Sequence, residues 1–539
     1  MCTNNRFSIP ITASLLSPLL ISLLLFSSVR AQQKNPVDIL EADSLVGGSV
    51  NGERVQKILG NVRLQSGDIL MRCDSAYQFV NQNEFRAFGD IEINTGEENI
   101  WADTLVYFTD IDFSQLRGRV IIEADTTTLF GHSVDYRFST KVAHFIDHVR
   151  LEDQQGVLIA NSGFYYREAD SAMFYGQVQL ADSLQYLEGD SLLTNRKSEY
   201  YEVHGDIFAD DRENETMLKG TYLEADSTGR RVLQGNAWLK NYGSNKQDTT
   251  ATDTTQIIPS APPDSLRQDT LRQSGIPSDS LADVLSDTAL TARTENREQA
   301  EADTTHIRAK EILSLRQKTA TDTSTITYAY GDVRIWSRKF SAISDSARYE
   351  SSTETFELWS DPVAWHDAVQ LTGPYIKVLL REGEIEQLSS YPNPFSVQQD
   401  TTIGRLNQIK GDTLTAFFTE GSLDRIHVVG NSHLLRFTKD EAEKPDGAIE
   451  MTAPVTHIMF DNGELDSLIA TGAINGSYLP ESDQTTNRRL DGFAWNPEQR
   501  PQRPEQKMEP RFPPIPDERP FTLPRRYREY IEKVEGSEQ

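Results

Sequence analysis

Hydrophobic and polar residues follow one pattern seven times between residues 36 and 240. A glycine, replaced once by Asp147, precedes a short alternation of apolar and polar side chains, and the copies lie 29 residues apart, or 30 at the last step. They begin at Gly60, Gly89, Gly118, Asp147, Gly176, Gly205 and Gly235. Alternation with a period of two is typical of a β-strand that buries one face. A constant period indicates units that stack on their neighbours.

The apolar positions of these copies predict which side chains point inward. They are the second and fourth residues after the glycine, and the residues between them, such as Arg63 and Glu92, are mostly polar. We therefore expect an inward-facing set, here called the ladder, made of Val62, Leu64, Ile91, Ile93, Val120, Ile122, Val149, Leu151, Val178 and Leu180. Such a set ordinarily forms a dry core, and the lining of an apolar cleft is the alternative.

Each unit also contains a second strand. An apolar residue follows eleven positions after the glycine, a small residue after thirteen and often an aspartate after fourteen. Each unit thus predicts two strands joined by turns, with the glycine at a bend. We interpret the recurring aspartates as turn residues, whose side chains bond their own backbone: Asp43, Asp74, Asp103, Asp190, Asp345 and Asp412. About fourteen strands and almost no helix predict an all-β fold, elongated as a long jelly roll or a solenoid.

Composition divides the chain beyond this first β-domain, which we place at residues 32–241. Residues 242–305 are rich in Asp, Thr, Ser and Gln, and no aromatic residue lies between Tyr242 and Tyr328, so we expect a disordered linker. The repeat signature returns at Gly331-Asp332-Val333 and predicts a second β-domain at residues 306–480. Residues 481–539 contain nine prolines and many charges, and we expect a disordered tail, with a short helix from Tyr527 to Val534 as the alternative.

The N-terminus has the form of a secretory signal peptide. Arg6 precedes an apolar run from Ile9 to Phe26, and Val29-Arg30-Ala31 ends in a small residue before Gln32. We therefore expect residues 1–31 to be removed during export, and an uncleaved membrane anchor is the alternative.

Charge and composition narrow the classes of function. Lys and Arg number 53 against 81 Asp and Glu, a net charge of -28, which argues against binding of nucleic acid or of an anionic membrane surface. Two cysteines, Cys2 and Cys73, build neither a disulfide framework nor a zinc cluster. His144 and His148 lack a third ligand nearby in the sequence. No grouping typical of a nucleophile, a phosphate loop or paired carboxylates occurs, so we expect no enzyme, no cofactor and no metal.

The repeats resemble the OstA-like (LptA-like) proteins of double-membraned bacteria. The resemblance rests on Ala-Asp-Ser/Thr with apolar and aromatic residues, followed by glycine and a short strand. The best copies are Ala42-Asp43-Ser44-Leu45 with Gly60-Asn61-Val62-Arg63-Leu64, and Ala102-Asp103-Thr104-Leu105-Val106-Tyr107 with Gly118-Arg119-Val120. The resemblance implies a twisted, open β-jelly roll, covers both β-domains and is best over residues 36–240. Two β-domains, a long linker and a tail depart from the short family form.

The resemblance implies a periplasmic protein that binds lipopolysaccharide and contributes to outer-membrane assembly. Its groove would shield the acyl chains of lipid A, and the ladder would be the lining. Implied partners are lipopolysaccharide and other transport components joined by strand-edge pairing, with self-association and association with the outer membrane also compatible. The alternative from another class is an exported structural or adhesive β-repeat protein with a dry core. An exported carbohydrate-cleaving enzyme would need clustered exposed carboxylates, which periodic aspartates do not supply.

Overall fold

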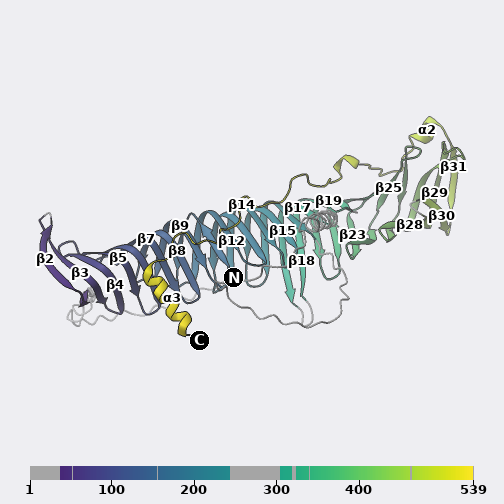
Figure 1. Ribbon diagram of the computed structural model, residues 1–539. Helices are drawn as coiled ribbons and strands as arrows, with labels where there is room; N and C mark the ends of the chain where they lie inside the picture. Colours follow the sequence, from purple (N-terminus) through teal and green to yellow (C-terminus); the bar gives the residue numbers. More distant parts are fainter. Residues whose placement is uncertain are drawn as a thin grey trace, which may run out of the picture.

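The computed structural model describes residues 37–50, 52–154, 156–242, 304–318, 323–338, 340–461 and 464–537. The predicted signal peptide and nearly all of the predicted linker lie outside these ranges. The described strands form one long, twisted antiparallel sheet (Figure 1). Its first part consists of β1 Asp38–Glu41, β2 Ser44–Val50, β3 Glu53–Ser66, β4 Ile69–Phe79, β5 Glu84–Asn94, β6 Glu98–Phe108, β7 Phe113–Ala124, β8 Thr127–Arg137, β9 Val142–Glu152, β10 Val157–Ala160, β11 Ser162–Tyr166, β12 Ser171–Ala181, β13 Gln185–Asn195, β14 Tyr200–Asp211, β15 Thr216–Ala225 and β16 Arg230–Asn241.

The two strands predicted for each repeat are present, and the glycine lies at a bend. In β5 the pairing with β6 shifts between Phe88 and Ile91, where Gly89 and Asp90 both have positive φ. β1 and β2 are the two halves of one such bent strand, as are β10 and β11, so the first part holds the fourteen predicted strands. The all-β prediction is confirmed.

The bends divide the sheet into two arms that enclose one interior. Phe85 and Ala87 precede the bend of β5, and we call their side of the sheet arm A; Ile91 and Ile93 follow it, and we call their side arm B. All four side chains belong to the same buried cluster, which continues through the other strands. The apolar faces of both arms are thus removed from water by packing against each other.

The bend depends on a close contact between neighbouring strands. Gly89 has φ +81°, and a Cβ there would lie 2.8 Å from the Cβ of Asp74 on the previous strand. The same arrangement joins Gly118 to Asp103. The interpretation of these aspartates as turn residues that bond their own backbone is wrong for Asp103, which accepts hydrogen bonds from the backbone N–H (3.0 Å) and the guanidinium of Arg119 on the next strand. The aspartates recur with the period of the repeat because each bend brings one of them against a glycine, and only glycine leaves room for the aspartate side chain.

The predicted separation into two β-domains is also wrong. β16 pairs with β17 Thr305–Lys318 along its length, with Asn241 opposite Thr305 and Arg230 opposite Leu315. The indole N–H of Trp238 donates to Nδ1 of His306 across this pair at 3.1 Å. One sheet therefore continues from the first part into the second, whatever path residues 243–303 take.

The second part begins with the same bent strands and then changes its connections. β21–β22 and β25–β26 are hairpins within arm B, whereas β23–β24 is a hairpin within arm A, which explains why the sequence period loosens after residue 360. The remaining strands are β18 Thr323–Trp336, β19 Ser341–Glu350, β20 Thr355–Trp359, β21 Val363–His366, β22 Val369–Thr372, β23 Tyr375–Arg381, β24 Glu384–Ser390, β25 Phe395–Asp400, β26 Arg405–Lys410, β27 Thr413–Thr419, β28 Ser422–Lys439, β29 Pro445–Asp461, β30 Glu464–Thr471 and β31 Asn475–Pro480.

The tail is placed against the sheet, which corrects the prediction of disorder. After α2 (Asp483–Thr486) and η1 (Pro497–Gln499) it runs back along the outside of the sheet to α3 (Arg525–Ser537), which lies beside β5 to β8 (Figure 1). Tyr527 of α3 packs against Trp101, with ring centroids 4.7 Å apart. The tail has too few apolar residues to form a core of its own, so its composition suggested disorder. It is ordered because it buries its few aromatic residues on the sheet. No helix within the described ranges has the length and apolar character to cross a membrane.

The contact at the bend gives a prediction for two glycines. Gly89→Ala is expected to lower the midpoint of thermal unfolding more than Gly96→Ala. Both residues have φ near +80°, but the space around Gly96 is open, whereas a Cβ at Gly89 meets Asp74. Gly96→Ala should cost only the backbone strain of about 1–2 kcal/mol, and Gly89→Ala should cost roughly 1–3 kcal/mol more from overpacking. Equal shifts in differential scanning calorimetry would contradict this account of the bend.

Candidate functional site

The ladder lies in the interior, as predicted, with one exception at its end. Nine of its residues are at most 7% exposed: Val62, Leu64, Ile91, Ile93, Val120, Ile122, Val149, Leu151 and Val178. Leu180 is 37% exposed, although it lies in register between Leu158 of β10 and Leu187 of β13. Leu180 thus keeps the inward register of the ladder but is partly open to solvent.

Elsewhere the interior is filled by side chains from both arms. Phe145 and Phe174 are fully buried, and Tyr136 is 2% exposed. In the second part of the sheet, an interior hollow lined by residues such as Leu388 and Leu414 has a volume of about 10 Å³, which is room for roughly one water molecule. In this closed form the ladder is a packed core. Acyl chains would enter only if the arms moved apart.

The open side of the two arms, opposite the bends, is bordered by charged turns. Arm A contributes a basic rim, which we define as Lys141, Arg167, Arg196 and Arg231. Arm B contributes an acidic rim, which we define as Glu97, Glu98, Asp125, Asp153 and Asp211. These residues form ion pairs across the mouth of the interior.

The distances show how closely the rims meet. Nζ of Lys141 lies 2.5 Å from a carboxylate oxygen of Glu97, and Nη1 of Arg167 lies 3.1 Å from the same oxygen. Nη2 of Arg167 lies 3.4 Å from Asp125. Further along the mouth Arg196 pairs with Asp153, and Arg231 with Asp211 at 2.9 Å. Several linked pairs hold the arms together more firmly than isolated surface pairs would.

Glu98 is the most buried member of the acidic rim. Its side chain is 1% exposed, it accepts a hydrogen bond from the hydroxyl of Tyr136, and it lies 3.3 Å from Nε of Arg167. Burial raises the pKa of Glu98, although the Tyr136 hydrogen bond and the charge of Arg167 act in the opposite direction. This carboxyl therefore fixes the position of the Arg167 guanidinium from the inner side of the mouth.

Two other rim carboxyls, Glu97 and Asp211, respond to pH in the opposite sense. The hydrogen bond from Lys141 lowers the pKa of Glu97. Burial alone would raise the pKa of Asp211, but hydrogen bonds from Arg231 and Asn214 outweigh it and leave the pKa lowered. Because these pKa values lie below those of the unfolded chain, the stabilisation by these pairs is complete above the unfolded values and is lost as the pH falls through the folded ones.

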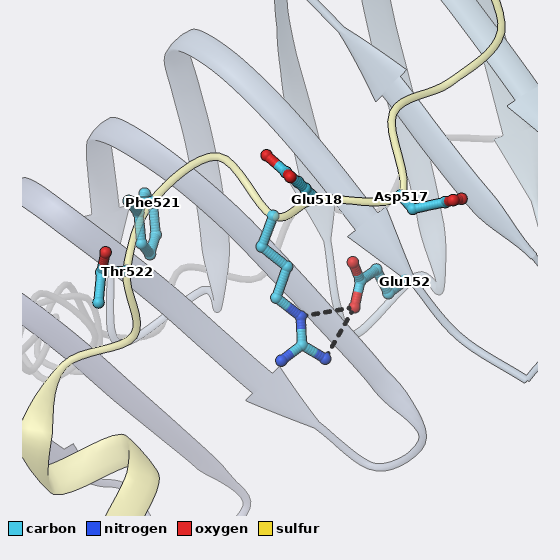
Figure 2. A pocket seen from close by; sticks show the side chains of 6 residues that line it. Glu152, Asp517, Glu518, Phe521 and Thr522 are labelled. Carbon is cyan, nitrogen blue, oxygen red and sulfur yellow. Dashed lines mark hydrogen bonds and ion pairs between the residues drawn. The ribbon is translucent and has the colours of Figure 1, made fainter. Parts of the chain in front are cut away.

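The tail borders a hollow on the outer face of arm B, away from the interior. Nη2 of Arg519 lies 3.1 Å from a carboxylate oxygen of Glu152. In Figure 2 the carboxylates of Asp517 and Glu518 point away from Glu152. Phe521 beside them packs edge-on against Phe130 of the sheet. The hollow is open to solvent and marks where the tail crosses the strands.

The histidines and the cysteine that the sequence analysis considered as metal ligands make contacts typical of structural residues. His144 stacks on Phe164, and His148 lies 2.5 Å from Asp147. Cys73 is fully buried, and burial raises the pKa of its thiol to about 12, so it packs as a small apolar side chain. Within the described ranges, no three His, Cys, Asp or Glu side chains lie in an arrangement that could hold a metal ion.

The sequence contains signals for two features that the sequence-based predictions do not include. The rim residues Glu97, Asp125 and Asp153 recur every 28 residues, almost the repeat period, but they fall in turns, where polar residues are ordinary. Outward positions of the strands hold the apolar residues Trp101, Ile121 and Phe130, whereas equivalent positions of other repeats include Arg72, Glu92 and Arg150. These three apolar residues pack under α3 and the segment before it: Phe521, Leu523, Tyr527, Tyr530 and Ile531.

Contact between the rims can be tested chemically. A water-soluble carbodiimide should join Glu97 to Lys141 by an amide bond, because their side chains touch across the mouth. Mass spectrometry of peptides should find this link, and Glu97→Gln should abolish it. Lys439 and Glu443, 3.4 Å apart on one strand and its turn, serve as the internal control. A link at the control pair without a link at the rims would show that the mouth is open in solution.

Comparison with known proteins adds a family to this geometry. No curated protein matches the chain. Residues 34–190 match the family model described as OstA-like protein. The matched segment contains β1 to β12 and the start of β13, and with them the whole ladder and the rim residues from Glu97 to Arg167. Over these residues the chain is similar to the OstA-like family.

Proposed function

We propose that this protein is exported to the periplasm, binds lipopolysaccharide there and carries it toward the outer membrane. The acyl chains of lipid A lie between arms A and B, and the headgroup remains at the mouth. The observation that carries the proposal is an apolar interior that runs continuously through bent strands and is bordered by two charged rims. The OstA-like domain supports it through the transport context of that family.

Burial of acyl chains supplies the free energy of binding. Removal of each methylene from water is worth about 0.8 kcal/mol, so a few chains suffice to offset separation of the arms and loss of rim ion pairs. The exposed Leu180 marks a place where the interior is already accessible. A chain that entered there would next meet Leu158 and Leu187, its neighbours in the sheet.

The two ends of the sheet fit partners that add a strand. β2 at one end exposes Leu45 (57%) and Val46 (48%), and the last strands expose Ile469 (52%) and Tyr478 (51%). An apolar edge strand that remains unpaired is a template for pairing with another chain. We propose that other transport components, or second copies, join at these ends and extend the interior from one protein to the next.

A second candidate function is that of an exported structural or adhesive β-repeat protein with a dry core. It is favoured by the dense packing of the ladder, in which Ile91, Ile93 and Val120 are fully buried. In that case the rim ion pairs would only stabilise the fold, and no ligand would part the arms.

Photocrosslinking in living cells separates the two candidates. A photoreactive amino acid at Ile93, which points inward, should form an adduct with lipopolysaccharide. The same probe at Glu92, the outward neighbour that pairs with Arg72, should not. If probes at Ile93, Val120 and Val178 all failed to capture glycolipid, the transport proposal would be wrong and the dry-core candidate would remain.

A further inference from the structure

We propose that Lys141 and Arg167 form a binding site for a phosphate group of the lipid, and that the Glu97 carboxylate occupies this site when no lipid is bound. The inference rests on the proposed function, because it assigns the lipid headgroup to a place on the mouth. Glu97 now bridges both cations, at 2.5 Å from Nζ of Lys141 and 3.1 Å from Nη1 of Arg167. A lipid phosphate in its place would receive both contacts.

The two cations of this site are more buried than the carboxylates that pair with them, as an exchangeable anion requires. The Arg167 side chain is 13% exposed and that of Lys141 is 28% exposed, whereas the carboxylate side chains of Glu97 and Asp125 are 58% and 84% exposed. A released Glu97 returns to water at little cost. A partly buried guanidinium without an anion would be unfavourable, so Arg167 favours replacement of the carboxylate over simple separation.

Arg167 is held in a position to accept the new anion. Its Nε faces the buried Glu98 at 3.3 Å, while Nη1 and Nη2 face the exposed Glu97 and Asp125. The inner contact can persist while both outer nitrogens change partners. A guanidinium presents parallel N–H groups that match phosphate oxygens as well as those of a carboxylate.

The rest of the basic rim is built differently, which restricts the site to one part of the mouth. Arg196 and Arg231 are 34% and 33% exposed, but their partners Asp153 and Asp211 are only 9% and 8% exposed. Buried carboxylates are poor leaving partners, because they would lose their ion pair without gaining full hydration. These two pairs hold the arms together, and the exchangeable pairs lie at Lys141 and Arg167.

The position suits a lipid headgroup. Lys141 and Arg167 lie at the ends of the directly paired strands β9 and β11, and the backbone N–H of Arg167 donates to the carbonyl oxygen of Lys141 at 3.2 Å. Tyr136, on the inner side of the same site, belongs to the buried cluster that also contains Ile93 and Ile122. A lipid with its chains between the arms would therefore place its phosphates at this level, where interior and solvent meet.

Binding of lipopolysaccharide and of the same lipopolysaccharide after enzymatic dephosphorylation tests the inference. Lys141→Gln should weaken binding of the phosphorylated form about tenfold or more, as expected for loss of a charged contact, and leave binding of the dephosphorylated form unchanged. Glu97→Gln should strengthen binding of the phosphorylated form. Both variants break the same Lys141–Glu97 pair, so an effect of a loosened mouth alone would shift both in one direction. Arg334→Gln, at an exposed pair on the outer face, is the charge-matched control.

The possible outcomes distinguish failure of the phosphate site from failure of the proposed function. Shifts of Lys141→Gln and Glu97→Gln in the same direction, or equal binding of both lipid forms by the wild-type protein, would overturn the phosphate site and leave the proposed function intact. A wild-type protein that bound neither form would overturn the proposed function itself. Inorganic phosphate alone should compete only weakly; if it displaced the phosphorylated lipid as strongly as that lipid binds, the site would serve free phosphate.

Discussion

In most repeats one strand passes from arm A to arm B at a glycine that lies against an acidic or polar side chain of the strand before. At Gly89 this neighbour is Asp74, and at Gly176 it is Asn161. Because the contact recurs every 29 residues, the bends align into one ridge, and the sheet folds on itself along its length. The enclosed interior, the mouth and the two rims all follow from this repeated bend. A flat sheet with the same alternation would expose one apolar face to water along its whole length.

The folded sheet has to satisfy two opposing requirements at the mouth. The apolar interior favours closure. Ion pairs between the rims complete it and join residues far apart in the sequence: 44 positions separate Glu97 from Lys141, and 42 separate Asp125 from Arg167. The proposed function requires that the mouth nevertheless open. Ion pairs at a partly exposed surface suit this balance, because each contributes little and can be exchanged for water or for another anion. The ladder alone, packed as it is, would stabilise the closed form without providing a way to open it.

Features determined within one repeat were predictable from the sequence, and features that join distant segments were not. The ladder positions were correct from Val62 to Val178, because alternation and period depend on neighbouring residues. The continuous sheet was missed, since the pairing of Asn241 with Thr305 leaves no local pattern. The placement of the tail was missed for the same reason, although Trp101 at an outward position indicated that something covers it. The rims were missed because charged residues in turns need no special explanation until the fold brings both turns together.

The proposed transport requires arms that are closed without lipid and part to admit it. Spin labels at Thr126→Cys on an arm B turn and Glu168→Cys on an arm A turn, both exposed, report the distance across the mouth by pulsed electron–electron double resonance. The native cysteines Cys2 and Cys73 would be replaced by alanine. The account predicts a short, narrow distance distribution for the free protein and a shift to longer distances when lipopolysaccharide is added. An unchanged distribution with lipopolysaccharide demonstrably bound would contradict it, because the lipid would then occupy some place other than the interior.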